Sequence, residues 1–214
     1  MATDTAAPVR RSGRARTILI WAGLAVAVAV PVAAASMSPQ LQWRDPIYIV
    51  AGFAGVMTLP LLLLQPLLAA RWLPGLKPIS ARRLHIALGL TLAAATLVHV
   101  GGLWITSPPD VVDALLLRSP TPFSLWGVIA MWALLGSVFL VLLRSRLRRR
   151  TWQAVHFALS LVIIAGAIAH ALLIEGTMEW LSKVLICTLV ALTGGFVVLP
   201  RLKQIGGRRK AKSP

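Results

Sequence analysis

The four histidines of this chain form two pairs with the same spacing. His85 and His99 are 14 residues apart, and so are His156 and His170. Fourteen residues turn a helix through ~1400°, about 40° short of four full turns, so each pair lies on one helix face. At ~1.5 Å per residue the two rings are ~21 Å apart, which is most of a ~30 Å hydrocarbon core. Two such helices side by side would present facing imidazoles at two depths, a ligand set for two bis-histidine haems.

Other roles are open to a histidine in a membrane helix. It can be a polar contact between helices, a proton relay or an interfacial residue. His85 and His156 lie close to arginine clusters, so the interfacial interpretation applies to them in particular. A repeated spacing that uses every histidine favours haem ligation, through the pairs His85/His156 and His99/His170. Two-ligand zinc or copper sites ~21 Å apart are a weaker alternative.

The composition indicates a membrane protein. Of the 214 residues, 57% are hydrophobic and 13% are charged, whereas soluble domains carry about 25% charged residues. The single Cys187 excludes an internal disulfide and a cysteine-ligated metal cluster. The sequence contains no glycine-rich dinucleotide fingerprint. It also has no carboxylate inside an apolar segment, which argues against an ion-coupled transporter.

Six apolar segments are each close to the ~20 residues that a spanning helix requires. They cover residues 17–35, 47–70, 84–105, 123–143, 152–174 and 181–199. We expect helices, because lipid offers no water to satisfy backbone groups. The predicted fold is therefore all-α, a polytopic six-helix transmembrane bundle with two haems between its third and fifth helices. The bundle would occupy residues 17–200, with basic tails at 1–16 and 201–214.

The formal charge of +16 is distributed as a topology signal rather than as a nucleic-acid surface. Nineteen of the 22 Lys and Arg residues lie in the two tails and in the second and fourth connections, whereas five of the six acidic residues lie in the other loops. This positive-inside pattern predicts a multi-pass protein of a bacterial-type inner membrane with both termini in the cytoplasm. We expect membrane lipid and no nucleic acid as a partner. A cleavable signal peptide is an alternative for the first segment, although its apolar run is long for one.

Several residues near the histidines are candidates for contact with haem. Arginines near the cytoplasmic end are candidates for pairing with haem propionates, although topology alone explains them. These arginines are Arg82, Arg83 and Arg150. Gly89 and Gly166 lie between the histidines of their helices, where a small residue lets either a macrocycle or a second helix approach the backbone. Both interpretations stay open.

Two stretches of the chain resemble the ferric reductase-like transmembrane domain. Residues 82–90, followed by Leu97-Val98-His99, are similar to the third helix of that family, and residues 152–156 and Ala169-His170 are similar to its fifth. The resemblance covers about residues 40–200. The family includes the haem core of ferric reductases and NADPH oxidases, and the haem-binding membrane subunit of the periplasmic methionine sulfoxide reductase system. It implies that all four histidines are axial ligands of haem iron.

The function implied by this resemblance is that of an integral membrane b-type cytochrome. Two b haems would pass electrons to an external acceptor, either ferric iron or a periplasmic redox partner. Because these 214 residues contain no flavin domain, the expected donor is a separate cytoplasmic flavin reductase or membrane quinol. The chain would then be an oxidoreductase component without a further catalytic residue. One alternative is a subunit of a methionine sulfoxide reductase-type repair system, in which the position that matches His85 often lacks histidine. The other alternative is a non-catalytic membrane anchor.

Overall fold

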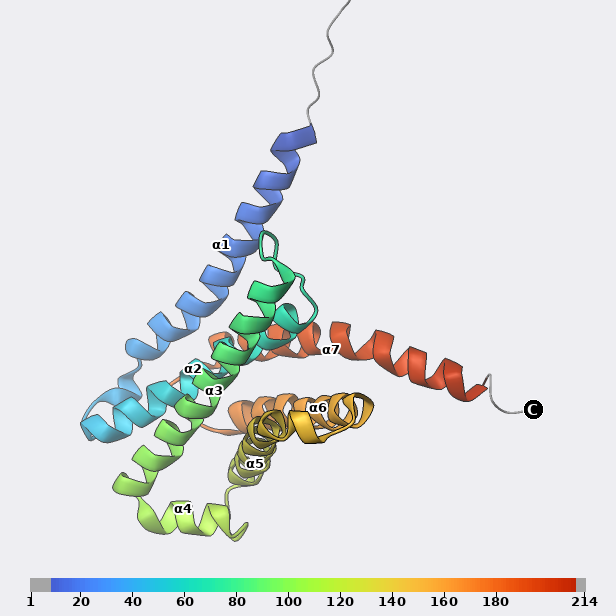
Figure 1. The fold of residues 1–214 in the computed structure, drawn as a ribbon. Helices are drawn as coiled ribbons and strands as arrows, with labels where there is room; N and C mark the ends of the chain where they lie inside the picture. Colours follow the sequence, from blue (N-terminus) through green and yellow to red (C-terminus); the bar gives the residue numbers. More distant parts are fainter. Residues whose placement is uncertain (1–8, 211–214) are drawn as a thin grey trace, which may run out of the picture.

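The computed structural model describes residues 9–210, with side chains for residues 13–199, and this part of the chain contains helices and no strand (Figure 1). The predicted tails, 1–16 and 201–214, fall largely outside the described side chains. The helices are α1 (Val9–Ser36), α2 (Pro46–Ala69), α3 (Pro78–Thr106), α4 (Pro108–Leu115), α5 (Pro122–Leu142), α6 (Arg149–Leu173) and α7 (Trp180–Lys210). Two 3-10 turns, η1 (Pro39–Leu41) and η2 (Arg144–Arg146), lie in the connections.

Six of these helices are long and apolar enough to cross a membrane, and the predicted six-span, all-α fold is confirmed. The spans belong to α1, α2, α3, α5, α6 and α7. Three of them begin at least three residues earlier than predicted: α1 at Val9 rather than Thr17, α3 at Pro78 rather than Leu84, and α6 at Arg149 rather than Trp152. The first two turns of α3 and the first turn of α6 contain arginines, which lower the local hydropathy without preventing helix formation. Proline is also favourable at a first helical position.

The connection between the third and fourth spans contains α4, a helix that the sequence analysis did not predict. Its apolar residues are too few for a span, and Pro108 and Pro109 lie between the predicted segments 84–105 and 123–143. Both prolines occupy the first turn, where no backbone N–H is needed. Asp110 in the same turn complements the positive end of the helix dipole. α4 lies across one end of the bundle, between α3 and α5 (Figure 1).

The bundle is built from two helical hairpins. α3 packs chiefly against α2, and α6 packs chiefly against α5, while α7 joins the hairpins by contacting α2 and α6. The main apolar core contains the fully buried Leu63, Ile186 and Val190. Only 11% of the α3 span and 17% of the α6 span are buried, against 33% for α2 and 39% for α5. The two histidine-bearing helices are therefore poorly covered by the protein itself.

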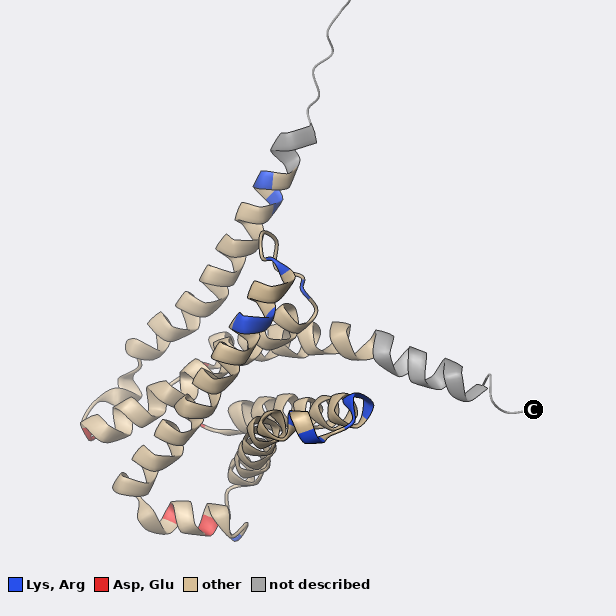
Figure 2. Ribbon diagram, viewed as in Figure 1, with Lys and Arg blue, Asp and Glu red and all other residues tan. Residues whose placement is uncertain are grey.

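Opposite charges occupy opposite ends of the bundle (Figure 2). One end, which we call the basic end, contains the starts of α1, α3 and α6 and the turns before α3 and α6. It carries the described arginines apart from Arg44 and Arg118. The opposite end, the acidic end, holds α4 and the starts of α2 and α7. Its carboxylates are Asp45, Asp110, Asp113, Glu175 and Glu179.

Candidate functional site

The structure brings the four histidines together as two facing pairs. At the basic end, the ring centres of His85 and His156 are 6.3 Å apart, and the ring planes make an angle of 78°. At the acidic end, the ring centres of His99 and His170 are 6.4 Å apart, again at 78°. Each pair joins α3 to α6. Because His85 and His156 come first on their helices and pair with each other, α3 and α6 run parallel.

Backbone carbonyls hold both imidazoles of the acidic-end pair. Nδ1 of His99 lies 2.7 Å from the carbonyl oxygen of Ala51 on α2. Nδ1 of His170 lies 2.8 Å from the carbonyl oxygen of Phe123 on α5. A carbonyl oxygen only accepts hydrogen bonds, so both Nδ1 atoms carry the proton and donate it. The remaining nitrogen of each ring, Nε2, then keeps its lone pair for a metal.

Side chains take the place of these carbonyls at the basic end. Nδ1 of His156 lies 2.9 Å from the hydroxyl oxygen of Ser137 on α5. Beside Nδ1 of His85 lie the side-chain amide of Gln65 at 2.7 Å and the carbonyl oxygen of the same residue at 3.3 Å. When Nδ1 of His85 is protonated, it donates a hydrogen bond to the amide oxygen of Gln65. When it is not, the amide nitrogen donates instead, and the amide oxygen accepts from the N–H of Gly89 at 3.0 Å.

An aromatic stack extends the basic-end pair towards the end of the bundle. The ring of Trp152 lies one turn before His156 and stacks on it, with centres 5.3 Å apart and an angle of 5°. The guanidinium of Arg144 in η2 is 5.5 Å from the centre of the Trp152 ring. The indole N–H of Trp152 is buried and has no hydrogen-bond partner among the described residues. A buried donor of this kind is a candidate for pairing with a bound acceptor.

The other candidate residues occupy different surroundings. Arg82 and Arg83 in the second turn of α3 and Arg150 in the first turn of α6 are exposed, on the helices that carry the histidines. A Cβ on Gly89 would meet only the Gln65 side chain, at 3.8 Å. A Cβ on Gly166 would lie 2.9 Å from the carbonyl oxygen of Trp126 on α5, so Gly166 allows α5 and α6 to pack closely.

No group of three His, Cys, Asp or Glu side chains is positioned to hold a metal ion within the described part of the chain. A protein-ligated zinc site requires at least three such ligands, whereas a haem iron requires at most two because the porphyrin supplies the others. The histidine pairs therefore match the donor number of haem better than that of a simple metal ion.

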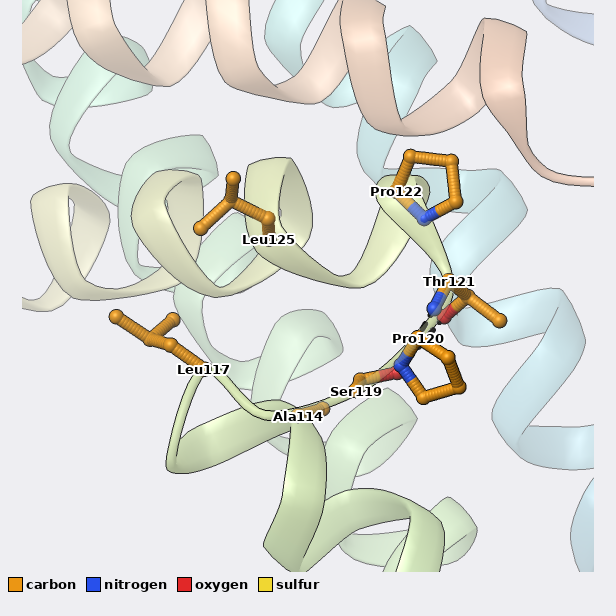
Figure 3. A pocket seen from close by; sticks show the side chains of 7 residues that line it. All are labelled: Ala114, Leu117, Ser119, Pro120, Thr121, Pro122 and Leu125. Carbon is orange, nitrogen blue, oxygen red and sulfur yellow. Dashed lines mark hydrogen bonds between the residues drawn. The ribbon is translucent and has the colours of Figure 1, made fainter.

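A small pocket at the acidic end lies between α4 and the start of α5 (Figure 3). Its lining residues are Ala114, Leu117, Ser119, Pro120, Thr121, Pro122 and Leu125. The hydroxyl of Thr121 bonds to those of Ser119, at 2.8 Å, and Ser124, at 2.5 Å. These hydroxyls bond to one another and shape the turn that begins α5, so we assign no ligand to the pocket.

The comparisons with known proteins agree with this geometry. A family model described as "Ferric reductase like transmembrane component" matches residues 51–167, more than half of the chain. The chain belongs to this family. The match to the ferric reductase-like model includes His85, His99 and His156 and ends three residues before His170. No curated protein and no solved structure matches the chain.

The sequence analysis did not find the partners of the imidazoles. The hydrogen-bond partners in the α2–α3 hairpin have counterparts in the α5–α6 hairpin, at positions 72 residues further along the chain. Ala51 corresponds to Phe123, and Gln65 corresponds to Ser137. The residue types differ within each correspondence, so no repeated motif is visible. The 14-residue interval between the two acceptors of a hairpin, equal to that between the histidines, is the available signal.

Proposed function

We propose that this chain is a membrane-bound b-type cytochrome that conducts electrons across the membrane through two bis-histidine haems. The axial ligands are the pairs His85/His156 and His99/His170. The observation that carries the proposal is the repeated geometry: two facing imidazole pairs, 6.3 and 6.4 Å between ring centres, on parallel helices. The bound haems would supply one-electron oxidation and reduction, which low-spin bis-histidine iron performs well.

The ring separation supports coordination of one iron between each pair. An imidazole nitrogen bonds a transition metal at about 2.0–2.1 Å. In a five-membered ring with bonds of ~1.33 Å, each atom lies ~1.1 Å from the ring centre. Two axial imidazoles on one iron therefore have centres about 6.3 Å apart. Both observed separations agree with this value.

Hydrogen bonding and burial support the same assignment. An acceptor lies beside Nδ1 in all four imidazoles, which orients each ring and leaves Nε2 to face iron. The low burial of α3 and α6 leaves apolar surface that a macrocycle can cover. At the basic end, the partners we propose for propionate are Arg144 and the buried indole N–H of Trp152, together with the predicted Arg82, Arg83 and Arg150.

The charge distribution supports an outward direction of transfer, because it favours a cytoplasmic basic end. With the basic end in the cytoplasm and both termini on that side, electrons enter at His85/His156 and leave at His99/His170. The donor is a separate flavin reductase or membrane quinol, and the acceptor is ferric iron or a periplasmic redox protein. A facing pair at the basic end favours a two-haem cytochrome over a one-haem subunit of a methionine sulfoxide repair system.

The haem content of histidine variants tests the proposal. We expect two b haems per chain in the wild type by pyridine–haem assay, and one in His99→Ala and in His170→Ala. Thr96→Ala is the matched control: its hydroxyl bonds to the carbonyl of Leu92 on the same helix as His99, and the variant should keep both haems. Unchanged haem content in both histidine variants would overturn the ligand assignment. One haem in the wild type would favour the repair-system alternative, and none in folded protein supplied with haem would favour the anchor.

A further inference from the structure

Two glycines lie directly against the imidazoles of the acidic-end pair. A Cβ added to Gly55 on α2 would lie 2.7 Å from Nδ1 and 2.9 Å from Cε1 of His99. A Cβ added to Gly127 on α5 would lie 2.6 Å from Nδ1 and 3.0 Å from Cε1 of His170. Separations below 3.0 Å are essentially never seen for real Cβ atoms. Any other residue at these two positions would therefore displace the ring.

The position of each glycine explains why it is needed. In an α-helix the N–H of one residue bonds to the carbonyl four residues earlier. The carbonyls four residues before Gly55 and Gly127 belong to Ala51 and Phe123, the same carbonyls that lie beside the imidazoles. A carbonyl oxygen has two lone pairs, so it can accept both the helical N–H and an imidazole N–H. The ring must approach from the side on which a Cβ four residues later would project.

The basic end shows the contrasting arrangement. Four residues after Gln65 and Ser137, the chain has Ala69 and Val141, both of which carry a Cβ. There the close hydrogen-bond partners of the rings are side chains, the Gln65 amide at 2.7 Å and the Ser137 hydroxyl at 2.9 Å. The one carbonyl beside a basic-end ring, that of Gln65, is 3.3 Å from Nδ1 of His85. Glycine thus occurs in the two hairpins wherever a helical carbonyl is the close acceptor.

We propose that Gly55 and Gly127 are positioning residues for the acidic-end haem. By leaving the two carbonyls accessible, they fix the protonated nitrogen of each imidazole and hold the two ring planes at 78°. This role rests on the proposed haem ligation. It assigns the orientation of the two axial ligands to glycines on the neighbouring helices α2 and α5, which supply no ligand themselves.

Alanine variants with a matched control test the assignment. In Gly55→Ala and in Gly127→Ala we expect the acidic-end haem to be lost or shifted in reduction potential and in its ferric low-spin EPR signal, because ring-plane orientation governs the anisotropy of that signal. The basic-end haem should keep both properties. Gly101→Ala is the control: it lies two residues from His99, its added Cβ meets nothing within 4 Å, and it carries the same gain in helix propensity. Variants that match Gly101→Ala in haem content, potentials and EPR signals would overturn the proposal.

A double-mutant cycle keeps the proposal testable if an alanine variant accumulates poorly. We expect Gly55→Ala to lower the melting temperature when His99 is present and to have no such effect in the His99→Ala background, because the clash involves the ring alone. An equal loss in both backgrounds would overturn the proposal. The cycle is read from melting temperatures alone and needs no measurement of haem potential or EPR signal. A wild type that binds no haem would instead refute the proposed function, so the two failures are distinguishable.

Discussion

Replacing Ser137 by alanine should raise the reduction potential of the basic-end haem. The Ser137 hydroxyl lies 2.9 Å from Nδ1 of His156, and the serine is only 7% exposed. An acceptor at Nδ1 makes the imidazole a more basic ligand. A more basic ligand stabilises ferric iron more than ferrous iron, because the ferric ion has the higher charge. Removing the acceptor therefore favours the reduced state.

The size of the shift follows from the strength of one hydrogen bond. A hydrogen bond of this kind contributes a net ~0.5–1.5 kcal/mol. For a one-electron couple, 59 mV corresponds to a tenfold change in equilibrium, or about 1.4 kcal/mol. If the whole contribution distinguishes the two oxidation states, the potential rises by between ~20 and ~65 mV. A smaller distinction gives a smaller rise of the same sign.

An equilibrium redox titration followed by the haem absorbance measures this shift. We would make the variant in the His99→Ala background, where the proposed function leaves only the basic-end haem and its component needs no assignment. Ser160→Ala is the matched control, because its hydroxyl donates to the carbonyl oxygen of His156 at 2.7 Å and does not bond to the ring. A fall in potential, or the same shift in Ser137→Ala and Ser160→Ala, would refute the reasoning.

Two further predictions concern packing and voltage. Gly166→Ala should lower the melting temperature, because its Cβ would lie 2.9 Å from the Trp126 carbonyl oxygen, and overpacking costs ~1–3 kcal/mol. Gly136→Ala, whose Cβ would meet only Leu159 at 3.9 Å, should not, and an equal loss in both would contradict this packing role. The second prediction uses proteoliposomes with a membrane potential of 100 mV, positive at the acidic end. The two histidine pairs are ~21 Å apart, about 70% of a ~30 Å hydrocarbon core, so an electron moving between them would cross about 70% of this potential. The equilibrium between the two haems should therefore shift by ~70 mV towards reduction of the acidic-end haem. Absence of this shift, measured by spectroscopy of the two haems, would show that they lie at the same depth.

The fold was predictable because its determinants are local. The number of spans follows from the length of apolar runs, and each predicted segment overlaps one of the six spans. α4 was missed because an eight-residue helix is too short for a hydropathy signal, and its prolines also occur in loops. The early starts of α3 and α6 were missed for a related reason, since arginines near the start of a helix lower hydropathy while leaving the helix intact.

The partners of the histidines were not predictable in the same way. Which residues share one face of a helix depends on the helical period of 3.6 residues per turn, so the shared face of His85 and His99 could be derived from their spacing. The acceptors lie on different helices, and their positions depend on how α2 packs on α3 and α5 packs on α6. Two of them are backbone carbonyls, at Ala51 and Phe123, and a backbone carbonyl leaves no trace in residue type.

The two ends of the bundle give the two histidine pairs different electrical surroundings. Arginines around His85 and His156 favour the electron-bearing ferrous state by Coulomb attraction, and one acceptor there is a hydroxyl rather than an amide oxygen. At the acidic end both close acceptors are amide carbonyls, which favour ferric iron at His99 and His170. With the proposed haems bound, both effects would make the basic-end haem the stronger oxidant. Outward transfer would then run against this difference, and a membrane potential positive outside would act in its favour by ~1.6 kcal/mol per 100 mV over ~21 Å. Such an arrangement would couple the rate of electron export to the energised state of the membrane.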